Sequence, residues 1–325
     1  MGKKGGMAKY VLKRILLMLF TFFVIMTVCF MLVRILPREL PTDKVQAIAI
    51  QERWDALGYN EPLLVQYGIY WKNIITEWDF GTSWYIQFRE PAWNVLTSRL
   101  LPTVLVNLCS LLFSIPIGIA LGIFAAIKKN KWQDSVISTM VMVFISVPSY
   151  VYAFLVQYFF YFKLDILPLM VYSLNDAGGS WTSGKMFYSM IAPILALSFG
   201  EIAGLCRFTR AELTETLTSD YMLLARTKGL TRGQATVRHA LKNAMVPILP
   251  MIISSFIGIL GGSMIIEQIF AIPGVGQLYI KSIRLFDYDV FMMDMFFYVF
   301  IGLLAGIVVD ISYGFIDPRI RMGEK

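Results

Sequence analysis

The sequence predicts an all-α membrane protein that crosses the bilayer six times. Hydrophobic residues make up 57% of the 325-residue chain and charged residues only 16%, whereas a soluble domain carries about 25% charged residues. The mean hydropathy is +0.63. Apolar stretches of the length needed to cross a bilayer, about 20 residues, recur along the whole chain. The membrane span is therefore its unit of organisation.

Six stretches have this length. The first, residues 13–36, belongs to an N-terminal segment 1–36, and its apolar part is too long for a cleaved signal peptide. The other five lie in a transmembrane core that we expect at residues 95–314. They cover residues 103–127, 136–162, 191–208, 246–270 and 293–316. Pro116 and Pro148 should bend the second and third spans, because a proline removes one backbone hydrogen bond.

The distribution of basic residues orients these spans. With both termini inside, the cytoplasmic segments are 1–14, 128–134, 207–246 and a short tail, 317–325, and they hold 18 of the 29 Lys and Arg residues. Short cytoplasmic loops carry such an excess. The net charge of +7 therefore indicates topology and not a nucleic-acid partner, since no basic patch is interleaved with exposed aromatic residues.

A long extracellular segment, residues 37–100, follows the first span. It is too long for a simple connection, and its eight acidic residues outnumber its six basic ones. Two amphipathic helices are predicted within it, the first ending at Gly58 and the second beginning after Pro62. The apolar stripe of the first is Ala47, Ile50, Trp54 and Leu57, and that of the second is Leu63, Tyr67, Tyr70 and Ile74. These helices either cap the bundle or face the substrate.

The chain lacks the residue patterns of an enzyme. The three cysteines lie singly in apolar stretches, and the single histidine has no nucleophile or metal-ligand partner at a recognisable spacing. Residues 179–185 match the phosphate-binding pattern GxxxxGK, but Met186 stands where that pattern needs a Ser or Thr to hold magnesium. We therefore predict no catalytic site, no metal site and no cofactor in this chain.

The cytoplasmic loop 209–246 is the most informative segment. A helical pattern over residues 220–228 is broken at Gly229, and a second short helix with several basic residues follows. A basic helix–glycine–helix that projects from the membrane can dock into a groove on a partner protein. An ordinary loop that obeys the positive-inside rule is the alternative.

This loop resembles the coupling loop of ABC importer permeases, in which a glycine follows an alanine-containing helix and the next short helix inserts into the ATPase subunit. The sequences Ala225-Arg226-x-Lys228-Gly229-Leu230 and Arg238-His239-Ala240-Leu241-x-Asn243-Ala244 resemble the dipeptide/oligopeptide branch. Further resemblances occur in order along nearly the whole chain. They are Arg34-Ile-Leu-Pro37, Leu57-Gly58, Phe80-Gly81-x-Ser83, Arg99-Leu-Leu-Pro102-Thr103, Glu267-x-x-Phe270-x-Ile272-Pro273-Gly274-x-Gly276, Asp287-Tyr288 and Asp317-Pro318-Arg319. Two departures are Leu223, where the family has a glutamate, and residues 37–41, which differ from its Pro-Gly-Asp-Pro.

The resemblance implies a type I importer permease in a bacterial inner or plasma membrane, forming half of the pathway for di- or oligopeptides. It implies four kinds of partner: a homologous second permease, two cytoplasmic ATPase subunits that hold ATP and magnesium, an extracellular or periplasmic substrate-binding protein, and membrane lipid. Relatives of the same architecture import nickel or oligosaccharides. The residues it assigns to ATPase coupling are Ala225, Lys228, Gly229, Arg232, Arg238, His239 and Asn243.

Three acidic residues lie in or near the spans, where charges usually pair or face a cavity. Glu201 lies in the fourth span, Glu267 could meet Arg284 near the outer end of the fifth, and Asp310 lies within reach of basic groups at the inner end of the sixth. Each acid has either a structural partner or a place in the substrate pathway. An ATP-independent carrier or channel is the rival class, and it would need titratable groups or broken helices at mid-membrane. Apart from Glu201, the spans offer few such groups.

Overall fold

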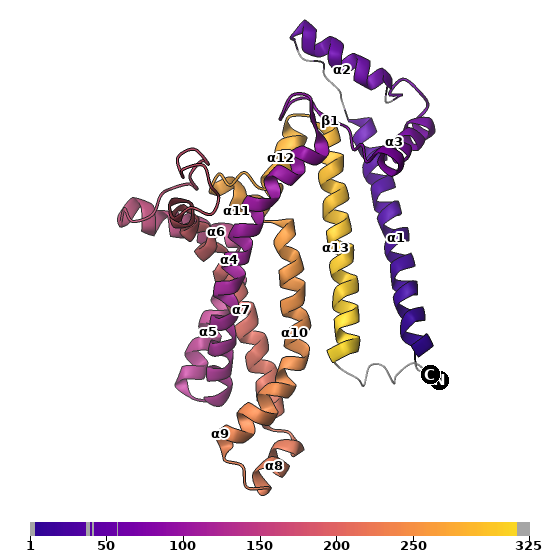
Figure 1. The fold of residues 1–325 in the computed structure, drawn as a ribbon. Helices are drawn as coiled ribbons and strands as arrows, with labels where there is room; N and C mark the ends of the chain where they lie inside the picture. Colours follow the sequence, from indigo (N-terminus) through magenta and orange to yellow (C-terminus); the bar gives the residue numbers. More distant parts are fainter. Residues whose placement is uncertain (1–3, 37–39, 41, 57, 317–325) are drawn as a thin grey trace.

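The computed structural model describes residues 4–36, 40, 42–56 and 58–316. Within these residues, five helices are long and apolar enough to cross a membrane, or six if one bent pair counts as a single span. The spanning helices are α1 (Lys4–Ile35), α4 (Ala92–Ile127), α7 (Gly184–Leu217), α10 (Leu241–Gly258) and α13 (Tyr288–Ile316). Figure 1 shows α1, α10 and α13 standing side by side, with α2 and α3 beyond one end of the bundle and α8 and α9 beyond the other. The predicted all-α membrane fold is confirmed.

Helices α4 and α7 pack against each other along most of their length. Two glycines of α4 allow this close approach. A Cβ atom at Gly118 would lie 2.7 Å from the Cβ of Leu205, and one at Gly122 would lie 2.7 Å from the carbonyl oxygen of Cys206. Small residues let helices meet at short distance in a membrane, where apolar lipid removes the hydrophobic driving force between helices.

The third predicted span, residues 136–162, is not one straight helix. Helix α5 (Trp132–Ser146) is followed by α6 (Ser149–Gln157) and the π-helix η1 (Tyr158–Lys163) after a bend of 99°. The expected bend at Pro148 is confirmed, and its size has a local cause. Proline drives the residue before it out of the helical region, and Val147 is accordingly extended, with φ −92° and ψ 126°.

The helix that contains most of the fifth predicted span, residues 246–270, begins and ends earlier than that span. The helix begins at Arg232 and runs without a break to Gly261, through α9 (Arg232–Ala235), the π-helix η2 (Thr236–Ala240), α10 and the 3₁₀-helix η3 (Ile259–Gly261). It stops at Gly262, whose φ of +62° suits glycine. A separate short helix, α11 (Met264–Ile269), follows.

The helix that contains the fourth predicted span, residues 191–208, is longer than that span. Helix α7 continues to Leu217 through Arg207, Arg210 and Glu212, which ended the apolar stretch but not the helix. Hydropathy therefore detected only the part of α7 that has an apolar composition. In the same way, α4 begins at Ala92, well before the predicted start at residue 103.

The extracellular insert contains α2 (Lys44–Ala56), α3 (Leu63–Glu77) and a small antiparallel ladder, β1 (Thr82–Ser83) with β2 (Glu90–Pro91). Both predicted helices are present, although Leu57 lies outside the described residues. Only α3 is amphipathic, since α2 also exposes apolar side chains, with Val45 72% and Ile48 61% exposed. Helix α3 packs on α1 and α13 through aromatic side chains, including Tyr67 and Trp71 against Phe22 and Phe30. The insert is therefore bound to the bundle. Residues 37–41, where the sequence differs from the family's Pro-Gly-Asp-Pro, also lie outside the described residues except for Leu40. The tail 317–325 lies outside them as well.

Candidate functional site

The cytoplasmic loop forms a protruding knob, which we define as residues 218–243. Its first helix, α8 (Asp220–Thr227), ends in a left-handed turn at Gly229, with φ +89°. The Gly229 N–H donates to the Arg226 carbonyl at 3.0 Å, and the Leu230 N–H donates to the Ala225 carbonyl at 3.3 Å. This pair of bonds is a Schellman motif. Because a Cβ at Gly229 would meet nothing within 4 Å, the backbone conformation and not the available space favours glycine here.

The second helix of the knob starts sharply at a capping box. The Thr231 hydroxyl accepts from the Gln234 N–H at 3.3 Å, and the Gln234 side chain accepts from the Thr231 N–H at 3.1 Å. The predicted second short helix is in fact the first turns of the helix that becomes α10. A displacement of this part of the knob therefore passes into a spanning helix without an intervening loop. Arg238 and His239 lie in the π-helical turn η2, a kind of irregularity that is frequent at functional sites.

The inner side of the knob packs on the ends of α4 and α7. Its buried residues are mostly alanines, which join Ala126 of α4 and Leu213 of α7 in one cluster. Those alanines are Ala225, Ala235 and Ala240, and Ala244, just beyond the knob in α10, joins the same cluster. Ala225 is only 5% exposed, so it packs the knob against the bundle, and our expectation that it contacts a partner directly is wrong.

The outer side of the knob carries the remaining predicted residues. Each of the following is exposed: Lys228, Gly229, Arg232, Arg238, His239 and Asn243. Sequence reasoning missed three apolar neighbours, Leu223, Leu224 and Val237, which are 66%, 55% and 66% exposed. Exposed leucines in a basic cytoplasmic loop suit a protein contact. The one sequence feature that could have indicated these exposed apolar residues is Leu223, which stands where the family has a glutamate. We call Leu223, Leu224, Lys228, Arg232, Val237, Arg238 and His239 the knob surface.

Glu267 is a structural anchor and does not pair with Arg284 as expected. Its carboxylate accepts from the Thr103 hydroxyl of α4 at 2.9 Å and from the Gln277 N–H of α12 (Val275–Arg284) at 2.9 Å. It is 2% exposed. Burial raises the pKa of the Glu267 carboxyl, and these hydrogen bonds oppose the shift. Glu267 therefore joins the spanning helix α4 to the short helices α11 and α12.

The other two acids differ in their surroundings. Asp310 of α13 forms an ion pair with Arg14 of α1 at 3.0 Å, so the expectation of a basic neighbour is confirmed. Glu201 lies near the middle of α7 and accepts from the Ser255 hydroxyl of α10 at 2.7 Å. It lines a cavity of about 250 Å³ between α4, α7 and α10. Glu201 thus has a hydrogen-bond partner and also faces a cavity, and its place in a substrate pathway stays a prediction.

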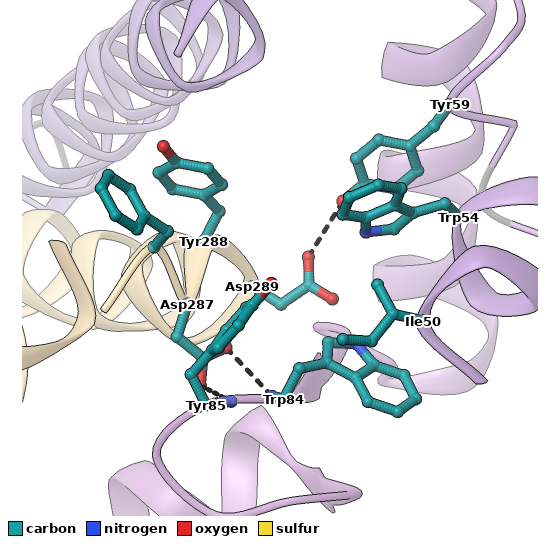
Figure 2. A pocket seen from close by; sticks show the side chains of 9 residues that line it. Ile50, Trp54, Tyr59, Trp84, Tyr85, Asp287, Tyr288 and Asp289 are labelled. Atoms are coloured by element: carbon teal, nitrogen blue, oxygen red, sulfur yellow. Dashed lines mark hydrogen bonds between the residues drawn. The ribbon is translucent and has the colours of Figure 1, made fainter. Parts of the chain in front are cut away.

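Aromatic residues of the extracellular insert lie against Asp287 and Asp289 at the outer end of α13 (Figure 2). Asp289 accepts from the Tyr59 hydroxyl at 3.3 Å, and Asp287 accepts from the backbone N–H groups of Trp84 and Tyr85 at 3.3 and 3.1 Å. The space between these side chains amounts to about 20 Å³, room for about one water. This contact holds the extracellular insert on α13 and leaves no room for a larger ligand.

Long apolar helices, a basic knob at one end and a mid-membrane cavity define a multi-pass membrane transport subunit. Residues 118–322 match the family described as the binding-protein-dependent transport system inner membrane component, and the chain belongs to this family. It is therefore a multi-pass protein of the bacterial inner or plasma membrane and the permease subunit of an importer, not an enzyme.

Several curated relatives match over almost their whole length. The dipeptide transport system permease protein DppB of Lactococcus lactis subsp. cremoris is 34% identical over 97% of this chain and 100% of its own, and that of Bacillus subtilis is 33% identical over 98% and 100%. The glutathione transport system permease protein GsiC of Escherichia coli K12 is 32% identical over 97% and 99%. A chain of the MetNI methionine ABC transporter has a TM-score of 0.53 at 17% identity, covering 69% of this chain and 97% of that one. The last likeness shows the fold alone.

Proposed function

We propose that this chain forms half of the transmembrane pathway of an ATP-driven peptide importer. The names of its relatives, dipeptide and glutathione permeases of about one-third identity, support the peptide cargo. The importer would contain a homologous second permease, two cytoplasmic ATPase subunits and a substrate-binding protein on the outer side. ATP and magnesium would bind to the ATPase subunits.

The observation that carries the mechanism is the unbroken helix from the knob into the membrane. The knob surface would dock into a groove on an ATPase subunit and move when ATP closes the ATPase dimer. Because residues 232–261 form one helix and α7 reaches the knob from the other side, this movement would tilt α10 and α7 together. The cavity between α4, α7 and α10 would then change its opening. A partner can shift such an equilibrium only if it contacts the two states differently, and the knob surface supplies that contact.

Uptake by the purified importer in liposomes tests this function. The complex would be reconstituted with its ATPase and binding-protein partners and supplied with radiolabelled trialanine outside and ATP inside. We expect trialanine accumulation that requires ATP and is absent with ATP replaced by a non-hydrolysable analogue. Equal accumulation without hydrolysis would favour a secondary carrier. ATP-dependent uptake of nickel or an oligosaccharide in place of peptides would retain the importer and overturn the cargo.

A further inference from the structure

Glu201 is a carboxylate placed halfway along a spanning helix. Helix α7 runs from Gly184 to Leu217, so Glu201 lies about 25 Å from each end. An acidic side chain at this depth is costly, and such residues usually face a cavity or mark a substrate path. Its surroundings therefore show what it could bind.

The cavity beside Glu201 is polar on three sides. Asn107 and Ser110 of α4 and Ser255 of α10 line it together with Glu201. The Asn107 amide N–H₂ donates to the Thr103 carbonyl at 2.8 Å, which leaves the Asn107 side-chain oxygen as an acceptor. The Ser255 hydroxyl donates to Glu201 and keeps its own lone pairs. The site thus presents acceptors around one negative charge.

The approach to this site is open. Gly258 of α10 lines the cavity, and a Cβ at this position would meet nothing within 4 Å. The cavity of about 250 Å³ is somewhat smaller than pockets that hold small ligands, about 300–1,000 Å³. The chain therefore supplies a part of a binding site, which the second permease would complete.

No cation of the described residues neutralises Glu201. The surrounding stretches 103–127, 186–206, 243–261 and 288–312 contain no Lys, Arg or His, and the ion pairs formed by described acids belong to Asp310, Asp79 and Asp134. The only partner found for the Glu201 carboxylate in the described chain is the Ser255 hydroxyl. A negative charge without a cation, in a polar cavity, matches a positively charged group on the cargo.

We propose that Glu201, assisted by Ser255 and Asn107, binds the amino-terminal ammonium group of a peptide as it crosses the membrane. This inference rests on the proposed peptide import. An ammonium group has three donors, and the three side chains offer one carboxylate and two neutral acceptors. The cavity lining contains no base for the peptide carboxylate, so that end would be bound outside this site.

The test compares Glu201→Gln with the wild type in reconstituted complexes that share one binding protein. At pH 7, uptake of trialanine by the variant should fall about tenfold, the factor that corresponds to the loss of one charge-assisted hydrogen bond. ATP hydrolysis should continue, so that more ATP is used per peptide. Glu201→Asp should restore a large part of the uptake. Glu77→Gln, at an exposed position of α3, is the matched control and should leave uptake unchanged.

A pH series separates ammonium binding from a structural role. The α-amino group of a peptide has a pKa of about 7.7–8.0, and the cavity lining holds no titratable side chain besides Glu201. The ratio of wild-type to Glu201→Gln uptake should therefore decline towards one between pH 7 and pH 9. The pH response of the shared binding protein cancels in this ratio.

Three results would overturn the inference: wild-type uptake by Glu201→Gln at pH 7, a ratio that does not change with pH, or no rescue by Glu201→Asp. Ser255→Ala, which removes only the neutral partner, should lower uptake less than Glu201→Gln does. Failure of the wild type to import trialanine at all would instead refute the proposed peptide import, so the two failures can be told apart.

Discussion

Replacement of Gly229 tests the knob most directly, because the structure separates backbone conformation from packing at this position. The φ of +89° is unfavourable for a residue with a side chain, whereas the added Cβ would meet nothing within 4 Å. Gly229→Ala should therefore cost about 1–2 kcal/mol in backbone conformation alone. That energy corresponds to a roughly 5–30-fold lower population of the observed turn. Gly229→Val should be worse, since a β-branched residue tolerates positive φ least.

The consequence should appear in coupling and not in assembly. The turn sets the angle between α8 and α9, while the alanine cluster beneath it is untouched by the substitution. We expect Gly229→Val to co-purify with its ATPase subunits and retain basal ATP hydrolysis, while peptide uptake falls more than about tenfold. Gly233→Ala is the matched control, because Gly233 is helical and equally free of neighbours. Wild-type uptake by Gly229→Val would refute the role assigned to the knob.

Three further substitutions test other contacts. Glu267→Ala leaves its buried donors without an acceptor, so the purified protein should lose about 1–3 kcal/mol of stability, and an unchanged melting temperature would contradict the anchor role. Gly122→Val forces α4 away from α7 and should cost about 1–3 kcal/mol through overpacking; thermal melting should show no comparable loss for Gly302→Ala, which has free space. Val237→Asp places a charge on the knob surface and should weaken pull-down of the ATPase subunits without changing the melting temperature; undiminished pull-down would exclude Val237 from that interface.

The sequence could predict much of the fold because its signals are local. An apolar stretch reveals a span wherever the surrounding medium is apolar, and basic residues reveal the side on which a loop lies. The same signals failed at helix ends. Helix α7 continues through Arg207 and Arg210, and the helix that begins at Arg232 enters the membrane without a break, because hydrogen bonding within a helix does not depend on the polarity of its side chains.

The candidate site, too, has features that the sequence predicts and features that it does not. The basic composition of the knob and its break at Gly229 could be predicted, since both are properties of a short segment. The orientation of its side chains could not: Ala225 packs inwards, whereas Leu223 and Val237 point outwards, and only the packing against α4 and α7 decides which faces are covered.

What the sequence determined by itself is a bundle of apolar helices with a basic, glycine-broken knob, because hydropathy, charge and the conformational freedom of glycine act within a few residues. The tertiary structure alone decided which distant groups meet. Thr103 reaches Glu267, which is 164 residues away, and Ser255 reaches Glu201, which is 54 residues away. Such partners depend on how helices pack in three dimensions, and neither span length nor residue spacing carries that information.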